Sequence, residues 1–261
     1  MEQIILQAEN IIRSFPSAGG EIPVLRGISL SIPKGKLVII KGRSGSGKTT
    51  LLNILSALDP ATDGEVVLRV RSDKKKSGSD AENEGSPAEL TNTREVRYSG
   101  LSDSQRDRLR RNHMGFVFQS VALVPIMTAY ENVDFGLRTA GYRKNTDKKT
   151  DPQAYRDKRI REVLSSVGLA ERMQHMPSQL SGGEQQRVAI ARAMAHKPEI
   201  IFADEPTGAL DTAAGLAVTQ LFKDMAEKEK ITIVMTTHDP GLMELGDVVY
   251  EIEDGMIGGQ P

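Results

Sequence analysis

The chain has 261 residues, of which 38% are hydrophobic and only 4% are aromatic, so its core must be aliphatic. Lysine and arginine (34) nearly balance aspartate and glutamate (35), and this disfavours a broadly basic nucleic-acid-binding protein. The absence of cysteine excludes disulfides and thiolate metal sites. No apolar run approaches the roughly 18 residues that cross a bilayer, and the first residues lack the basic start of a signal peptide. We therefore expect a globular, cytoplasmic protein.

The first third of the chain predicts strands around a loop. Apolar residues punctuated by Pro and Gly indicate antiparallel strands over residues 4–12 and 21–32. The run at residues 36–41 is typical of a strand buried on both faces, and an apolar helix is expected over residues 49–58. Residues 72–93 contain a single large apolar residue, so we interpret them as a flexible insertion, either a solvated spacer or a docking loop.

Helices and strands alternate through the remainder of the chain. Apolar spacing and charge pattern predict helices over residues 103–112, 151–167, 181–195 and around 218–225. Short strands are expected over residues 115–118, 200–203 and 231–236, followed by a hairpin over residues 248–257. This alternation predicts an α/β fold with a mainly parallel sheet, to which the N-terminus adds an antiparallel element.

A glycine-rich loop joins the buried strand at residues 36–41 to the following helix and fits the pattern G-x-x-x-x-G-K-[ST]. Glycines let successive backbone N–H groups turn toward phosphate oxygens, and the helix N-terminus adds partial positive charge. Lys48 is expected to reach the β- and γ-phosphates, and the Thr49 hydroxyl to ligate Mg²⁺. The predicted nucleotide-binding residues are Gly42, Ser44, Gly45, Ser46, Gly47, Lys48, Thr49 and Thr50.

Two other segments carry candidate chemistry. Asp204 and Glu205 end an apolar strand, where Asp204 would hold Mg²⁺ and Glu205 would deprotonate the attacking water; alone, the pair also fits a solvated acidic turn. Ser181 and Glu184 fit a helix capping box. The two glycines between them are not needed for capping and favour close approach of backbone N–H groups to an anion.

Together these residues resemble the ATPase subunits of ATP-binding-cassette (ABC) transporters, over essentially the whole chain except residues 72–93. Six motifs follow the family's order: Walker A (42–49), Q-loop (Gln119), signature (180–184), Walker B (200–205), D-loop (209–211) and switch histidine (His238). The resemblance implies one ABC ATPase domain over residues 1–261, with a P-loop NTPase core and an N-terminal antiparallel β subdomain. It also implies a helical signature-motif subdomain at about residues 120–190, and ATP with Mg²⁺ as cofactors.

The resemblance further implies a site shared between two copies of the chain. In the family two ATPase subunits pair head to tail around two ATP molecules. The ATP held by Lys48 of one copy would then meet residues of the other. These residues are Ser181, Gly182, Gly183 and Asp211.

Three isolated residues receive roles from the same resemblance. Gln119 would approach Mg²⁺ and the attacking water. His238 would contact the γ-phosphate, although a lone histidine at a strand end is more often a surface or hydrogen-bonded residue. Phe15 would stack on adenine, and its alternative is a core phenylalanine beside Pro16.

Residues 115–133 and 203–211 are similar to the lipoprotein-releasing and macrolide-export group within the family. This implies an integral membrane permease as partner, a peripheral location on the inner face of the cell membrane, and no nucleic-acid partner. The apolar residues 121–127 are a candidate docking surface or an ordinary core segment. A cell-division or cell-wall ABC ATPase without solute transport stays open. A DNA-repair or translation ABC ATPase is disfavoured, because the chain has one GKT loop and no heptad run.

Overall fold

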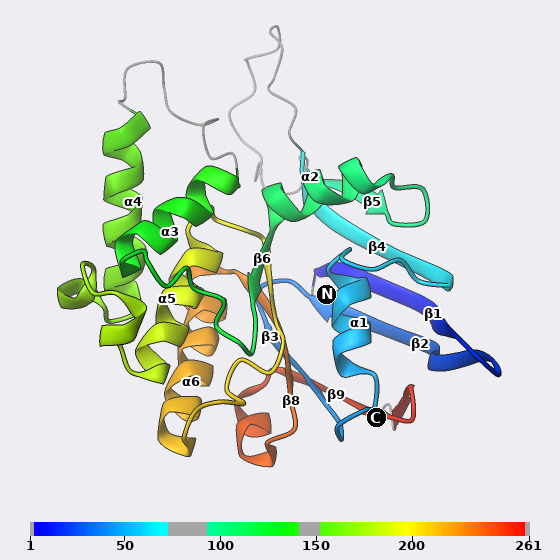
Figure 1. Ribbon diagram of the computed structural model, residues 1–261. Coiled ribbons are helices and arrows are strands. Elements are labelled where there is room, and N and C mark those ends of the chain that lie inside the picture. Colours follow the sequence, from blue (N-terminus) through cyan, green and yellow to red (C-terminus); the bar gives the residue numbers. More distant parts are fainter. Residues whose placement is uncertain (1–2, 73–92, 141–151, 259–261) are drawn as a thin grey trace, which may run out of the picture.

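The computed structural model describes residues 3–72, 93–140 and 152–258, so most of the predicted insertion lies outside the described residues. Figure 1 shows a central sheet with helices α3 to α6 on one side and an antiparallel sheet with α1 on the other. Among the described residues, no helix combines the length and the apolar character needed to cross a membrane. The expected α/β architecture with an N-terminal antiparallel sheet is confirmed.

The N-terminal sheet has four antiparallel strands in the order β2-β1-β4-β5. These strands are β1 (Ile4–Ser17), β2 (Gly20–Pro33), β4 (Asp63–Arg71) and β5 (Thr93–Arg97). The first strand is longer than predicted because it continues to a tight turn, where Ser17 pairs with Gly20. Thr93, assigned from the sequence to the insertion, instead begins β5.

The central sheet has six strands in the order β10-β9-β3-β8-β7-β6. These are β3 (Leu37–Lys41), β6 (Met114–Val117), β7 (Ile200–Ala203), β8 (Thr232–Thr237), β9 (Val248–Glu253) and β10 (Met256–Gly258). All neighbours pair in parallel except β9 and β10, which form the predicted hairpin around Asp254 and Gly255. Both turn residues have positive φ, as a two-residue hairpin turn requires.

The helices are α1 (Lys48–Leu55), α2 (Asp103–His113), α3 (Ala129–Thr139), α4 (Pro152–Ser166), α5 (Gly182–Met194) and α6 (Thr212–Glu229). Helix α1 ends three residues before the predicted end, because Ala57 adopts a left-handed conformation. Helix α3 was not individually predicted, and Gly136 in its interior weakens the helical signal. Its N-terminal capping box, formed by Thr128 and Glu131, was the signal that could have found it.

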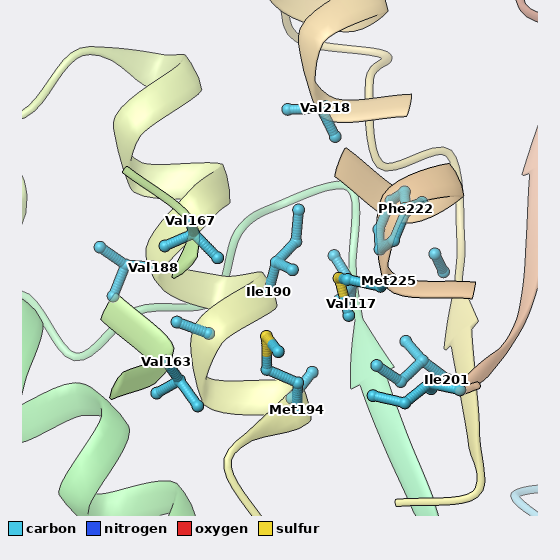
Figure 2. Close-up of a cluster of buried hydrophobic side chains, with 14 of the residues drawn as sticks. Val117, Val163, Val167, Val188, Ile190, Met194, Ile201, Val218, Phe222 and Met225 are labelled. Carbon is cyan, nitrogen blue, oxygen red and sulfur yellow. The ribbon is translucent and has the colours of Figure 1, made fainter. Parts of the chain in front are cut away.

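The central strands separate two aliphatic cores. On β3, Leu37 and Ile39 face the helices α3 to α6, whereas Val38 and Ile40 face the antiparallel sheet and α1. Figure 2 shows the core on the helical side, where Ile190 and Met194 of α5 lie, in this view, between Val163 and Val188 on one side and Phe222 and Ile201 on the other. Burial on both faces explains why these strands have continuous apolar runs rather than alternating patterns.

Candidate active site

The parallel strands bring four segments that are distant in the sequence to one edge of the central sheet. Strands β3, β8, β7 and β6 are neighbours in that order, and each is followed at its carboxyl end by a predicted site segment. The glycine-rich loop follows β3, His238 follows β8, Asp204 and Glu205 follow β7, and Gln119 lies two residues beyond β6. Ligands in open α/β folds bind at such an edge.

The glycine-rich loop has the conformation that the sequence predicts. Gly47 has a φ of 102° at the start of α1, a conformation that other residues rarely adopt. A Cβ at Gly42 would lie 2.4 Å from the carbonyl oxygen of Ile252, so only glycine fits there. No side chain caps the first turn of α1, and no acidic residue lies in it. The backbone N–H groups at the start of this helix therefore remain available to an anion.

Lys48 is 5% exposed, and its ammonium group lies inside the loop. Its Nζ donates hydrogen bonds to the carbonyl oxygens of Gly42 (2.9 Å) and Arg43 (3.0 Å). The Ser46 hydroxyl is also buried and has no hydrogen-bond partner among the described residues. A buried cation and an unpaired buried hydroxyl in one loop provide donors for phosphate oxygens.

Glu205, which follows β7, contacts one residue of the glycine-rich loop and one residue that follows β8. Its Oε1 lies 3.5 Å from Lys48 Nζ, and its Oε2 lies 3.3 Å from His238 Nδ1. Glu205 has a φ of 41°, a strained backbone conformation for a residue other than glycine. The structure therefore brings together three of the four predicted catalytic residues.

Asp204 lies beside the glycine-rich loop and beside β8. The Thr49 hydroxyl donates to Asp204 Oδ1 at 3.2 Å, and the Thr236 hydroxyl donates to the same oxygen at 2.7 Å. The Glu205 backbone N–H in turn donates to the Thr236 oxygen at 2.8 Å. The Thr236 hydroxyl thus forms hydrogen bonds with both acidic residues, a role that the sequence alone did not indicate. The available signal was the presence of threonine hydroxyls in a fully buried strand, where polar groups need hydrogen-bond partners, although β8 contains three threonines and the pattern alone does not single out Thr236.

The adjacent oxygens of Thr49 and Asp204 fit the predicted Mg²⁺ site. Mg²⁺ is usually held by one or two protein oxygens, with waters and substrate phosphates completing its octahedron. The described part of the chain contains no cluster of three or more His, Asp or Glu that could hold a metal ion. Gln119, the third predicted ligand, is exposed, and its amide lies against Gly208, where a Cβ would stand 3.0 Å from Nε2. No hydrogen bond between Gln119 and Thr49 or Asp204 occurs in the described structure.

The signature residues and the D-loop aspartate line a separate cavity of about 460 Å³. Ser181 caps α5, because its Oγ accepts the Glu184 N–H (3.3 Å) while the Glu184 carboxylate accepts the Ser181 N–H (2.8 Å). This bond lowers the pKa of Glu184. Asp211 caps α6 through Ala214 N–H at 2.8 Å. The capping interpretation is therefore correct, and Gly182 and Gly183 line the same cavity.

Within the described residues, no hydrogen bond or ion pair joins this cavity to the glycine-rich loop. The predicted nucleotide-binding residues of one chain thus form two separate groups. The first surrounds Lys48 and Glu205, and the second surrounds Ser181 and Asp211.

Phe15 lies on β1, opposite Ile22 of β2, and 37% of its surface is exposed. The alternative of a core phenylalanine is therefore wrong, because Phe15 belongs to neither aliphatic core. The Arg13 guanidinium lies over the ring, 4.5 Å from its centroid. An exposed aromatic ring suits a stacking role.

Residues 25–208 match the family described as ABC transporter. The chain belongs to this family. It is 39% identical to an uncharacterized ABC transporter ATP-binding protein of Methanocaldococcus jannaschii, over 97% of both chains. It is 38% identical to the lipoprotein-releasing system ATP-binding protein LolD of Alcanivorax borkumensis, over 97% of this chain and 96% of that one. The macrolide export ATP-binding/permease protein MacB of Bartonella henselae is 39% identical over 97% of this chain, which spans 33% of MacB.

Solved structures that are similar to this chain are also ATP-binding cassettes. One similar structure is a dimeric ATP-binding cassette in a post-hydrolysis state bound to ADP and Pi, with a TM-score of 0.76, 35% identity and 98% coverage of both chains. The expected resemblance to ABC transporter ATPases, with its P-loop fold, is confirmed. This chain is an ABC ATP-binding cassette of the ABC ATPase family.

Proposed function

We propose that this cassette hydrolyses ATP in an Mg²⁺-dependent reaction, dimerises around two ATP molecules and drives an integral membrane permease. The supporting observation is the position of Glu205, which contacts Lys48 and His238 beside the Asp204–Thr49 pair. A carboxylate next to a buried phosphate-binding lysine is well placed to accept a proton from water.

Each residue of this group has a role that follows from its contacts. Lys48 would exchange its two carbonyl partners for oxygens of the β- and γ-phosphates. Thr49 and Asp204 would hold Mg²⁺, which when bound neutralises charge on those oxygens. Glu205 would take the proton of the attacking water on its carboxylate. His238, which contacts Glu205 here, would contact the γ-phosphate in the ATP-bound state.

The remaining assignments complete the nucleotide site. We propose that Gln119, whose amide lies against Gly208 in the loop after β7, approaches the attacking water and the metal. Phe15 would stack on adenine, since its ring is exposed near the turn between β1 and β2. The backbone N–H groups of residues 42–50 would surround the phosphates.

A second copy of the chain would supply the other half of each site. The cavity of Ser181, Gly182, Gly183 and Asp211 is not connected to the Lys48 loop of its own chain. It offers a hydroxyl and a helix N-terminus, both of which suit a phosphate. A head-to-tail dimer would bring this cavity onto the ATP of the partner, and a dimeric cassette occurs among the similar structures.

The permease would dock beside the segment that follows β6, and the cassette would then lie on the cytoplasmic face of the membrane. An apolar groove of about 440 Å³ lies between α2 and α3, and both Phe118 and Phe135 are exposed in its wall. Within residues 121–127, Leu123 packs against the helical core, whereas the side chain of Ile126 is 81% exposed and available to a partner. Exposed apolar side chains around a groove favour a protein partner.

Replacement of Glu205 by Gln tests the ATPase assignment. We expect the ATPase rate to fall at least about 100-fold, the usual range for loss of a general base. The variant should form a dimer with ATP, measured by size-exclusion chromatography with light scattering. Glu253→Gln, an exposed acid at the end of β9, is the matched control and should behave like the parent chain. An unchanged rate in Glu205→Gln would remove Glu205 from the mechanism.

Replacement of exposed apolar residues tests the permease assignment. Phe118→Asp and Ile126→Asp should reduce recovery of a membrane subunit from detergent extracts, while the ATPase rate stays within about twofold of the parent chain. Co-purification with ribosomes or DNA, without a membrane subunit, would contradict the transporter assignment.

A further inference from the structure

The segment that follows Gln119 contains two consecutive strained residues. Val121 has a φ of 40° and Ala122 a φ of 47°, and neither is glycine. The Ala122 N–H bonds to the Ser120 carbonyl oxygen, which closes a three-residue turn around Val121. Such turns are rare and strained, above all with a β-branched residue at the centre. Conformations of this kind persist only where surrounding groups hold them.

The group that holds this turn is Arg192, on α5. Its Nη1 donates to the Ala122 carbonyl oxygen at 2.6 Å, and its Nη2 donates to the Val121 carbonyl oxygen at 3.3 Å. These contacts span 70 residues of sequence, and within the described residues no acid forms an ion pair with Arg192. Burial lowers the pKa of its guanidinium, but arginine stays charged in proteins. Hydrogen bonds from a charged donor are stronger than those of neutral groups.

A glycine of α3 leaves space for the Arg192 side chain. A Cβ at Gly136 would lie 2.6 Å from Arg192 Cγ, so any larger residue would displace the arginine stem. Glycine inside a helix is destabilising relative to alanine. Packing of the arginine stem is therefore a physical reason for a helix-weakening residue at this position.

The chain on both sides of the turn is fixed independently. Before it, β6 pairs with β7 up to Val117. After it, the fully buried Asn132 accepts the Val124 N–H (2.8 Å) and donates to the carbonyl oxygens of Met127 (2.9 Å) and Thr128 (3.0 Å). The turn at residues 120–122 is the part between these anchors, and Gln119 immediately precedes it. The Val121 N–H also donates to the Phe118 carbonyl oxygen at 3.2 Å and so joins this turn to the residues around Gln119. The geometry of the turn therefore contributes to where Gln119 lies.

We propose that Arg192 is a positioning residue for ATP hydrolysis, which holds the strained turn so that Gln119 stays beside Gly208, in the loop that follows Glu205. The assignment rests on the proposed role of Gln119. Arg192 belongs to the helix that begins after Ser181, so a shift of this helix is transmitted through two hydrogen bonds to the Gln119 segment.

A double-mutant cycle tests this assignment with the full chain and Mg-ATP. Arg192→Met keeps an unbranched stem over Gly136 but removes both hydrogen bonds. We expect kcat to fall about tenfold, as for lost hydrogen bonds to a charged group, with KM within about twofold. In the Gln119→Ala background the same replacement should change kcat by less than about twofold, because coupled residues are not additive.

Arg159→Met is the matched control. Arg159 of α4 also donates to two backbone carbonyl oxygens, those of Ala195 (3.0 Å) and Met194 (3.1 Å), but these lie at the end of α5 and not in the turn at residues 120–122. Its loss should lower stability without lowering kcat. Amide hydrogen exchange at residues 119–124 should accelerate in Arg192→Met and stay unchanged in Arg159→Met.

Three results would overturn the assignment. An unchanged kcat in Arg192→Met would show that the turn does not need Arg192. A full tenfold loss in the Gln119→Ala background would show that Arg192 acts elsewhere. If Gln119→Ala itself leaves kcat unchanged, the proposed role of Gln119 fails and the Arg192 assignment fails with it. Should Arg192→Met not fold, Arg192→Lys, whose ammonium is not a two-pronged donor, enters the same cycle with a smaller expected loss.

Discussion

The hydroxyl of Thr236 joins the two acids of the active site, and Thr236→Val removes that hydroxyl while keeping the shape of the side chain. Thr236 is fully buried in β8, so the replacement creates no cavity. Asp204 loses a donor at 2.7 Å, and the backbone N–H of Glu205 loses an acceptor at 2.8 Å. The effect is therefore confined to two hydrogen bonds.

The magnitude follows from those two bonds. A hydrogen bond to a charged group contributes about 1.5–3 kcal/mol and a neutral one about 0.5–1.5 kcal/mol. Because Asp204 and Glu205 are partly exposed, water replaces part of what is lost, and we expect the free energy of unfolding to fall by about 2 kcal/mol. For a chain of this size that lowers Tm by about 4–8 °C. Loss of support for the strained Glu205 backbone should lower kcat at least about tenfold, or about 1.4 kcal/mol.

Thermal unfolding and steady-state ATPase measurements test the predicted losses of stability and kcat, with Thr232→Val as the control. Thr232 is equally buried in the same strand, and its hydroxyl accepts one hydrogen bond, from Gly35 N–H at 2.9 Å. We expect this control to lose about 1 kcal/mol of stability with kcat unchanged. Equal kcat values for the two variants would refute the idea that Thr236 supports the catalytic acids.

Two further predictions concern nucleotide affinity and pH. Phe15→Ala should weaken ATP binding about 5- to 150-fold, since base stacking on an aromatic side chain contributes about 1–3 kcal/mol. Ile22→Ala on the neighbouring strand should not weaken it, and calorimetric Kd values that agree for both variants would contradict the stacking role. Glu184→Gln should lower Tm at neutral pH, because the bond from Ser181 lowers the pKa of Glu184 below its ordinary value of 4.5 and the carboxylate stabilises the folded state above that value. The Tm difference between parent and variant should vanish as the pH falls through the lowered pKa, and a difference independent of pH would exclude the charge of Glu184 as its cause.

Several site residues could be found from the sequence because local pattern determines them. The glycine-rich loop needs glycine at positions 42 and 47 for steric reasons that any such loop shares. Asp204 and His238 each follow a fully buried strand, and carboxyl ends of parallel strands meet at one edge. The pairing of Ser181 with Glu184 is a contact within one helical turn.

Other features depend on contacts that the local pattern does not encode. Helix α3 contains Gly136 because a larger residue at this position would clash with the side chain of Arg192 from α5. The burial of Lys48 and the exposure of Phe15 follow from how the two sheets pack, and a phenylalanine beside a proline fits core or surface equally well.

The sequence by itself determined the strand-and-helix order, the nucleotide-binding motifs and the resemblance to ABC transporter ATPases, because short-range sterics and periodicity act within a few residues of chain. Only the tertiary structure decided that Thr236 joins Asp204 to Glu205 and that Arg192 holds the turn after Gln119. These pairs lie about 30 and 70 residues apart in the sequence. Their contact depends on β8 lying between β3 and β7, and on α5 packing against α3, so no local pattern could predict them.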